Sequence, residues 1–137
     1  MTQLAQRLQA PMIRHLLRKG TVTYTPPAEL YVGLATSGAN LETGADDELT
    51  AVNAPGYARQ TVNFRNRAST DLEENDVDVV FSFTDATPTF THFFVAESAT
   101  VGSNDGVIYG PLDAPVTIGT GNNQYRLPIG ALIAAMQ

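Results

Sequence analysis

The spacing of hydrophobic residues changes near residue 20. In residues 2–19 apolar side chains recur every three or four positions, which predicts an amphipathic helix ending at Gly20. Pro11 lacks a backbone N–H and would cost about 3 kcal/mol in a helix interior. The helix is therefore expected either to begin at Pro11 or to kink there. The apolar stripe comprises Leu4, Leu8, Met12 and Leu16, widened by Ile13 and Leu17.

From Thr21 onward the hydrophobic period becomes two, which predicts strands. The clearest strand is residues 29–35, where Leu30, Val32 and Leu34 share one face. No predicted helices separate the strands to make parallel crossovers, so an antiparallel arrangement is favoured over a parallel one. The other expected strands are residues 21–24, 58–64, 77–83, 90–96, 107–109, 116–118, 125–127 and 131–135.

These patterns together predict a mainly β fold: an antiparallel β-sandwich or barrel-like domain preceded by one short N-terminal amphipathic helix. The expected division is a helix in residues 1–20 and a single β domain in residues 21–137. Residues 37–55 show no clear period and form a long loop, where a partner-facing surface is expected. The core is expected to contain Leu30, Val32, Leu34, Val62, Phe64, Val79, Phe81, Phe83, Phe93, Val95, Ile108, Leu112, Ile118, Leu127 and Leu132.

Charge is divided unevenly along this chain of net charge −6. The first 28 residues hold four basic and no acidic side chains, whereas the remaining 109 hold four basic and fourteen acidic ones. A basic segment of this kind can bind nucleic acid, a membrane surface or an acidic protein neighbour, or it can complement the dipole at a helix C-terminus. We favour the last interpretation, or protein docking by the same helix. The candidate interface is Leu4, Leu8, Met12 and Leu16 with Arg14 and Arg18.

The chain contains no cysteine, which excludes disulfides and Cys-ligated metal sites. It also has no run of eighteen apolar residues, so we expect neither a membrane-spanning helix nor an export signal. Aromatic residues lie in acidic or neutral strands, not among basic groups, so nucleic acid is not expected as a partner.

Catalytic machinery is not expected either. A triad around His15 or His92 would need a nucleophile presented on a strained turn, but the chain has no Gly-x-Ser-x-Gly motif. We therefore interpret His92 as a packing or hydrogen-bonding residue. The sequence predicts no enzyme activity and no cofactor.

Two acidic runs and one glycine-rich turn invite ligand-binding interpretations that their details do not support. Asp71–Asp78 departs from a calcium loop, with Asp76 where glycine is needed and Ser82 where glutamate is needed. We interpret this run, and Asp46–Glu48, as solvated turns. Gly119–Gly121 lacks the lysine of a phosphate loop and is interpreted as a hairpin turn.

Gly56, Tyr57 and Arg59 form a candidate structural clamp. Gly56 permits a tight entry into a strand, and Tyr57 and Arg59 project from the same strand face. A planar guanidinium can stack on a ring and also bind a carboxylate with two hydrogen bonds. The clamp could be internal, between a loop and the sheet, or could bridge two subunits.

The order of several short motifs resembles a family of small tailed-bacteriophage virion proteins, usually labelled tail fibre proteins. The motifs are Leu30–Leu34, Gly56–Arg59, Thr91–Val95, Tyr109–Leu112 with Pro115, and Leu127–Leu132. The resemblance implies a non-enzymatic structural protein of a phage particle, assembled in the host cytoplasm. It further implies a homo-oligomer, plausibly a trimer, whose partners are itself and other virion proteins, with no membrane partner.

Two alternatives stay open. Similar small β modules serve as capsid decoration or cement proteins, in which case the basic helix would lie on an acidic head surface. A carbohydrate-binding module would use exposed aromatic rings to stack on sugars. The candidates for that role are Tyr24, Tyr31, Tyr57 and Tyr125.

Overall fold

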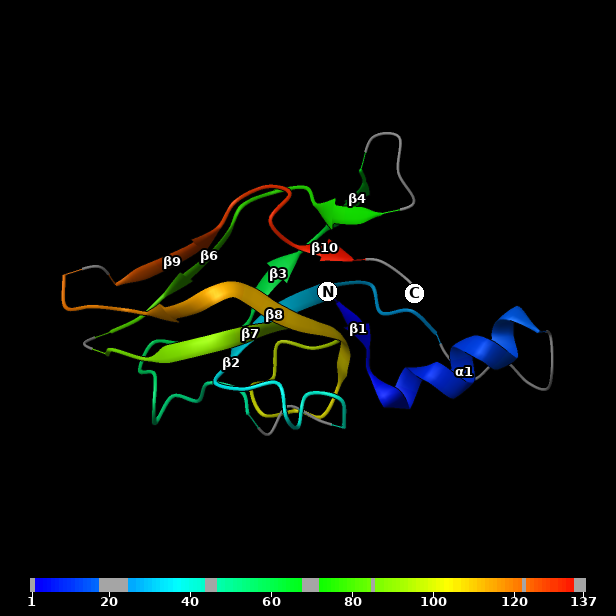
Figure 1. The fold of residues 1–137 in the computed structure, drawn as a ribbon, viewed down its shortest axis with the longest axis horizontal. Coiled ribbons are helices and arrows are strands. Elements are labelled where there is room, and N and C mark those ends of the chain that lie inside the picture. Colours follow the sequence, from blue (N-terminus) through cyan, green and yellow to red (C-terminus); the bar gives the residue numbers. More distant parts are fainter. Residues whose placement is uncertain are drawn as a thin grey trace.

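The computed structural model describes residues 2–17, 25–43, 47–67, 72–84, 86–121 and 123–134 (Figure 1). One helix, α1 (Gln6–Leu16), precedes most of the strands. The strands are β1 (Gln3–Leu4), β2 (Leu30–Ala35), β3 (Gln60–Val62), β4 (Phe64–Asn66), β5 (Glu73–Asn75), β6 (Val79–Ser82), β7 (Thr89–Ala96), β8 (Gly106–Thr117), β9 (Gln124–Leu127) and β10 (Ile133–Ala134).

All strand pairs are antiparallel, and they form three sheets. The largest has the order β1-β8-β7-β2-β3, and the smaller sheets are β10-β5-β4 and β6-β9. Only Asn63 separates β3 from β4, so the chain passes there from the large sheet into a small one. The predicted strand 58–64 is therefore split between two sheets. The prediction of a mainly β, antiparallel, sandwich-like fold with one short N-terminal helix is confirmed.

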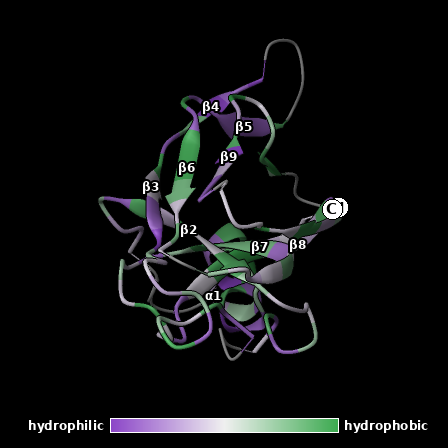
Figure 2. Cartoon of the chain, turned by 90° about the vertical axis from the view of Figure 1, so that its left-hand side faces the viewer, coloured by the Kyte–Doolittle hydropathy of each residue, from purple (hydrophilic) through white to green (hydrophobic). Residues whose placement is uncertain are grey.

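The main core lies between one face of the large sheet and the β6-β9 pair. Figure 2 shows β6 and β7 coloured mainly hydrophobic, whereas β4 and β5 are mainly hydrophilic. All fifteen predicted core positions lie in this core or pack against it. The prediction omitted four buried members, which are Leu49, Ala54, Tyr57 and Phe90.

The opposite face of the large sheet is also packed. Tyr31, Gly33 and Ala35 alternate with the core-facing residues of β2, and Gly33 lies under the ring of Phe94. A Cβ at Gly33 would come within 2.3 Å of that ring, so glycine is needed for this close approach. A second, smaller cluster of buried hydrophobic residues includes this ring; it consists of Ala35, Leu41, Phe94, Ala96 and Tyr109.

The helix begins later than predicted, because the chain before it is a strand. Gln3 and Leu4 pair with Tyr109 and Ile108 of β8, so the prediction of a helix from residue 2 is wrong. Two N–H groups at the helix start are bound by other segments: Ala5 N–H donates to the Val107 carbonyl at 2.7 Å and Gln6 N–H to the Glu42 carbonyl at 3.1 Å. These bonds satisfy donors that a helix terminus leaves free.

Pro11 lies inside α1, so the alternative in which the helix begins at Pro11 is also wrong. The predicted ends at residues 18–20 and the predicted strand 21–24 lie outside the described residues. Among the described residues, no helix has the length and hydropathy needed to span a membrane.

Three further predictions need correction. The acidic run Asp71–Asp78 is not simply a solvated turn, because Glu73–Asn75 forms β5 and Asn75 is fully buried. The predicted strands 107–109 and 116–118 belong to one strand, β8. Gly119–Gly121 is not a hairpin turn, because it connects β8 to β9, which pair with β7 and β6 respectively.

Candidate functional site

A buried ion pair between Glu48 and Arg59 is the most elaborate polar site in the described part of the chain. Arg59 Nε donates to Glu48 Oε1 at 2.8 Å and Nη2 donates to Oε2 at 2.9 Å, so the pairing is bidentate. The two side chains are 0% and 1% exposed. In a bidentate pair the guanidinium and the carboxylate form two parallel hydrogen bonds, which fix their relative orientation.

The rest of the Arg59 guanidinium binds the loop between β7 and β8. Nη1 donates to the Ser98 carbonyl at 2.9 Å and to Asp105 Oδ1 at 2.7 Å, and Nη2 donates to the Ser103 carbonyl at 3.0 Å. All five N–H donors of Arg59 are thereby used. Burial alone would lower the pKa of Arg59, but its hydrogen bonds to Glu48 and Asp105, and their negative charges, raise it.

Tyr57 connects this ion pair to the centre of the large sheet. Its hydroxyl donates to Glu48 Oε1 at 2.8 Å and accepts from the Leu34 backbone N–H at 2.9 Å. Burial, reinforced by the charge of Glu48, raises the pKa of Tyr57 well above its ordinary value. Tyr57 is therefore held as a neutral phenol, which can both donate and accept a hydrogen bond.

Gly56 supplies the turn that brings Tyr57 into place. Its φ is +84°, and a Cβ there would lie 2.8 Å from Thr84 Oγ1 and 2.9 Å from the Thr84 backbone nitrogen. A side chain at this position would be strained by both the backbone conformation and the contact. The structure thus places Gly56, Tyr57 and Arg59 on one internal network that links a loop to the sheet.

The sequence prediction missed Glu48, and the interpretation of Asp46–Glu48 as a solvated turn is wrong at that residue. Glu48 forms an isolated bridge with Ala35 and is followed by buried Leu49, whose N–H donates to the Leu34 carbonyl. The Gly102 N–H also donates to Glu48 Oε2 at 2.6 Å. An arginine next to a predicted buried strand needs a carboxylate partner, but with fourteen acidic residues the sequence alone does not select one.

Neighbouring Asp47 has a local role. Its Oδ2 accepts from the Ser37 hydroxyl at 2.7 Å and from the Asn40 backbone N–H at 3.0 Å. These bonds, the Ser37 bond foremost, hold the pKa of Asp47 below its ordinary value, although partial burial opposes the shift. Part of the loop 37–55 therefore serves to fold the loop itself.

The structure divides the predicted helix interface into a packed part and an exposed part. Leu4 is in β1 and half-buried, Leu8 is 3% exposed, and Met12 is half-buried. In contrast, Leu16 is 66% exposed, with Arg14 also exposed, and Arg18 lies outside the described residues. The exposed large apolar residues of this segment are Ile13, Leu16 and Leu17.

Arg7 fixes the first turn of α1 on the β body. Its Nε donates to the Gly106 carbonyl at 2.8 Å, and its Nη2 donates to the Asp105 carbonyl at 2.6 Å and lies 3.2 Å from Glu97 Oε2. From this attachment the helix extends beyond the sheets, at the end of the molecule opposite β6 and β9 (Figure 1).

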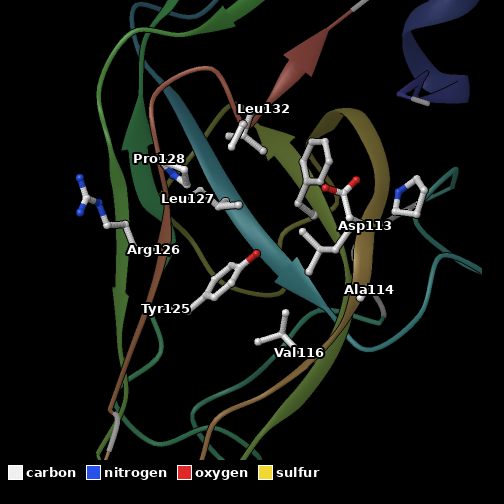
Figure 3. A pocket seen from close by; sticks show the side chains of 12 residues that line it. Asp113, Ala114, Val116, Tyr125, Arg126, Leu127, Pro128 and Leu132 are labelled. Atoms are coloured by element: carbon white, nitrogen blue, oxygen red, sulfur yellow. The ribbon is translucent and has the colours of Figure 1, made fainter.

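A cavity of about 350 Å³ lies between β8 and β9 (Figure 3). Figure 3 shows Tyr125, Leu127 and Leu132 extending into this space, whereas Arg126 points away from it. Burial, followed by the charge of Asp113, raises the pKa of the Tyr125 hydroxyl. We call this space the β8–β9 cavity; its wall comprises Phe93, Pro111, Leu112, Asp113, Ala114, Val116, Tyr125, Arg126, Leu127, Pro128, Ala131 and Leu132.

The other candidate side chains are placed as follows. His92 Nδ1 is 2.8 Å from the Thr91 hydroxyl and its ring lies against Gly38, while His15 is exposed in the last turn of α1. Among the described residues no three His, Asp or Glu side chains form a group that could hold a metal ion. Tyr57 is buried, so its proposed role in sugar stacking is wrong, and Tyr24 lies outside the described residues.

These features define a small β-rich structural module whose most elaborate polar network is internal and whose helix carries exposed apolar residues. The chain belongs to the family described as podophage GP4 fiber I protein gp80, whose model matches residues 3–135. The predicted resemblance to a tail-fibre-type phage family is thereby confirmed. This is a family of structural phage fibre proteins, which places the chain among virion components. Comparison with the curated proteins finds no match.

Proposed function

We propose that this protein is a structural component of a phage tail fibre, assembles as a homo-oligomer, and is attached to its neighbours through α1. The observation that carries this proposal is the exposed apolar end of α1. Ile13, Leu16 and Leu17 are 55%, 66% and 66% exposed, at positions three and four residues apart that share one helix face.

The base of the helix supports the proposal. Leu8 is buried and Arg7 binds the β7–β8 loop, so the β body fixes where the exposed end points. Preorganisation of this kind reduces the entropy lost on binding. The apolar end is thus presented in a defined direction to a neighbouring subunit.

The energetics also favour attachment by repeated contacts. Full burial of an aliphatic side chain of this size contributes roughly 1.5–3 kcal/mol, so three of them provide a modest contact per subunit. In a symmetric particle the same contact recurs, and linked contacts bind more tightly than each does alone. A small module with one apolar helix face suits that mode of assembly.

A triple variant tests the proposal: Ile13→Ser, Leu16→Ser and Leu17→Ser together. The matched control is Val52→Ser, which removes an apolar side chain that is 93% exposed on a loop. Each protein would be incubated with purified phage tails and with empty heads, and its mass would be measured by light scattering after size exclusion.

The expected result is binding to tails and self-association by the natural protein and the control, with both lost in the triple variant. Binding to heads instead of tails would overturn the fibre role in favour of a capsid decoration protein. Unchanged binding and mass in the triple variant would overturn attachment through α1.

A further inference from the structure

The β8–β9 cavity lies beside an irregularity in the large sheet. Val116 of β8 pairs with Phe90 and Pro111 pairs with His92, so residues 112–115 oppose only Thr91. Such a bulge bends the strand and leaves the extra residues out of the ladder. Three of these extra residues, Leu112 to Ala114, line the cavity.

The two strands beside the cavity are not joined by a ladder in the described structure. β8 pairs with β7 on both sides of the bulge and with β1 only at Ile108 and Tyr109, while β9 pairs with β6. Asp113 and Ala114 of its wall are exposed, so the cavity reaches the surface of the molecule. Its floor is apolar, formed by core residues that include Phe93, Leu127 and Leu132.

Two polar groups of the wall form no hydrogen bond or ion pair among the described residues, although the charge of Asp113 acts on the Tyr125 hydroxyl. Asp113 is exposed and makes no ion pair there, and the Tyr125 hydroxyl makes no hydrogen bond there. Both can accept a hydrogen bond, and Asp113 carries a negative charge. An occupant that combines apolar side chains with a cation would complement this wall.

The exposed end of α1 has that combination. Leu16 and Leu17 are apolar, and Arg14, three residues before Leu17, is exposed and forms no ion pair among the described side chains. Residues at this spacing are neighbours on a helix surface. The helix of the same chain extends away from β9 (Figure 1), so the complementary surface must be offered by another molecule.

We propose that the C-terminal half of α1 docks into the β8–β9 cavity of a second copy of this chain, with Leu16 and Leu17 over the apolar floor and Arg14 opposite Asp113. The inference rests on the proposed role of α1 and names the surface to which α1 binds. The overall charge agrees with it, since the first 28 residues carry +4 and the remaining 109 carry −10.

Contacts of this type join two different surfaces and are therefore heterologous. They close into a ring if the rotation between copies allows it, and otherwise extend as a filament. One helix end is small beside the roughly 1,200–2,000 Å² that specific stable interfaces bury, so we expect each contact to be weak and ring closure to supply the remaining affinity.

A charge exchange tests the pairing. Asp113→Arg and Arg14→Asp are each expected to weaken self-association about tenfold, because each places like charges together. The double variant restores the opposite charges and is expected to recover most of the loss. Glu73→Arg, at the exposed first residue of β5, is the control for the change in net charge. Sedimentation velocity over a concentration series measures all four.

Cross-linking supplies an independent readout, because the chain has no cysteine of its own. Leu17→Cys and Ala114→Cys proteins, mixed and mildly oxidised, are expected to form a disulfide-linked heterodimer. Leu17→Cys mixed with Val52→Cys is the control and should form far less.

The outcomes separate this inference from the proposed function. If the triple variant of α1 loses tail binding but the charge exchange shows no recovery and no specific cross-link forms, the acceptor is wrong and the role of α1 stands. If the triple variant also behaves like the natural protein, both are wrong. A chain that remains monomeric at every concentration overturns the inference directly.

Discussion

The Glu48–Arg59 network and the C-terminal end of α1 differ in where their side chains make contacts. In the network every donor of Arg59 is bound within the molecule, and its charge is buried with a matched carboxylate. At the end of α1, Leu16 and Leu17 are two thirds exposed and contribute little to the fold. The difference teaches which part determines the shape of the module and which part is available to a neighbour.

The largest expected effect comes from breaking the network on one side. Arg59→Met leaves the Glu48 carboxylate buried without a cation, which is expected to lower the free energy of unfolding by about 3–5 kcal/mol. Urea denaturation measures the loss. The double variant Glu48→Gln with Arg59→Met also removes the buried Glu48 charge and should be more stable than Arg59→Met alone. A double variant that is still less stable would contradict this explanation.

Two matched substitutions compare the packed and the exposed parts of α1. Leu8→Ala removes a buried side chain and is expected to cost about 2–3 kcal/mol. Leu16→Ala should change stability by no more than about 0.5 kcal/mol, as surface substitutions usually do. Thermal unfolding at concentrations where the chain is monomeric tests both, and similar losses would show that the two halves of the helix are packed alike.

The Phe94 ring connects the network to the large sheet, since the Arg59 guanidinium carbon lies 5.1 Å from its centroid and Gly33 lies against the same ring. Gly33→Ala is expected to cost about 1–3 kcal/mol through overpacking. Gly106→Ala, where an added Cβ meets nothing within 4 Å, is the control. Equal stability of the two variants in urea would show that the ring moves aside freely.

The smallest effect is a difference in alkaline stability. The pKa of Tyr57 is raised above its ordinary value of 10.0 in the folded chain, so the unfolded state loses its proton first as pH rises. The stabilisation is complete below pH 10 and declines above it. Between pH 10 and 11 the natural protein should lose roughly 1 kcal/mol more than Tyr57→Phe. Parallel pH profiles would contradict a buried neutral phenol at this position.

Much of the β body could be predicted because its signal is local. Alternation marks the core-facing residues of β2 and β6, and in β6 buried and exposed residues alternate as they do in a half-buried strand. Leu8 lies on the apolar stripe that the sequence predicts for the helix, and it is buried. These assignments need no knowledge of what lies opposite.

The features that escaped prediction depend on partners far away in the sequence. Leu4 fits the helical stripe, but pairing with Ile108 draws it into a strand. The sequence around Glu48 is typical of an exposed turn, and only the bonds from Arg59 and Tyr57 explain its burial. The β8–β9 cavity arises from a bulge, and bulges are set by the register of the neighbouring strand.

The Arg59 network is also expected to affect the rate at which the protein unfolds. Its bonds to the β7–β8 loop span 39 to 46 residues of sequence, so they can form only after long loops have closed. Interactions that form after the folding transition state slow unfolding without speeding folding. We expect the network to act in this way, lengthening the lifetime of the folded module. For a part that must keep its shape in a particle without being replaced, slow unfolding matters as much as equilibrium stability.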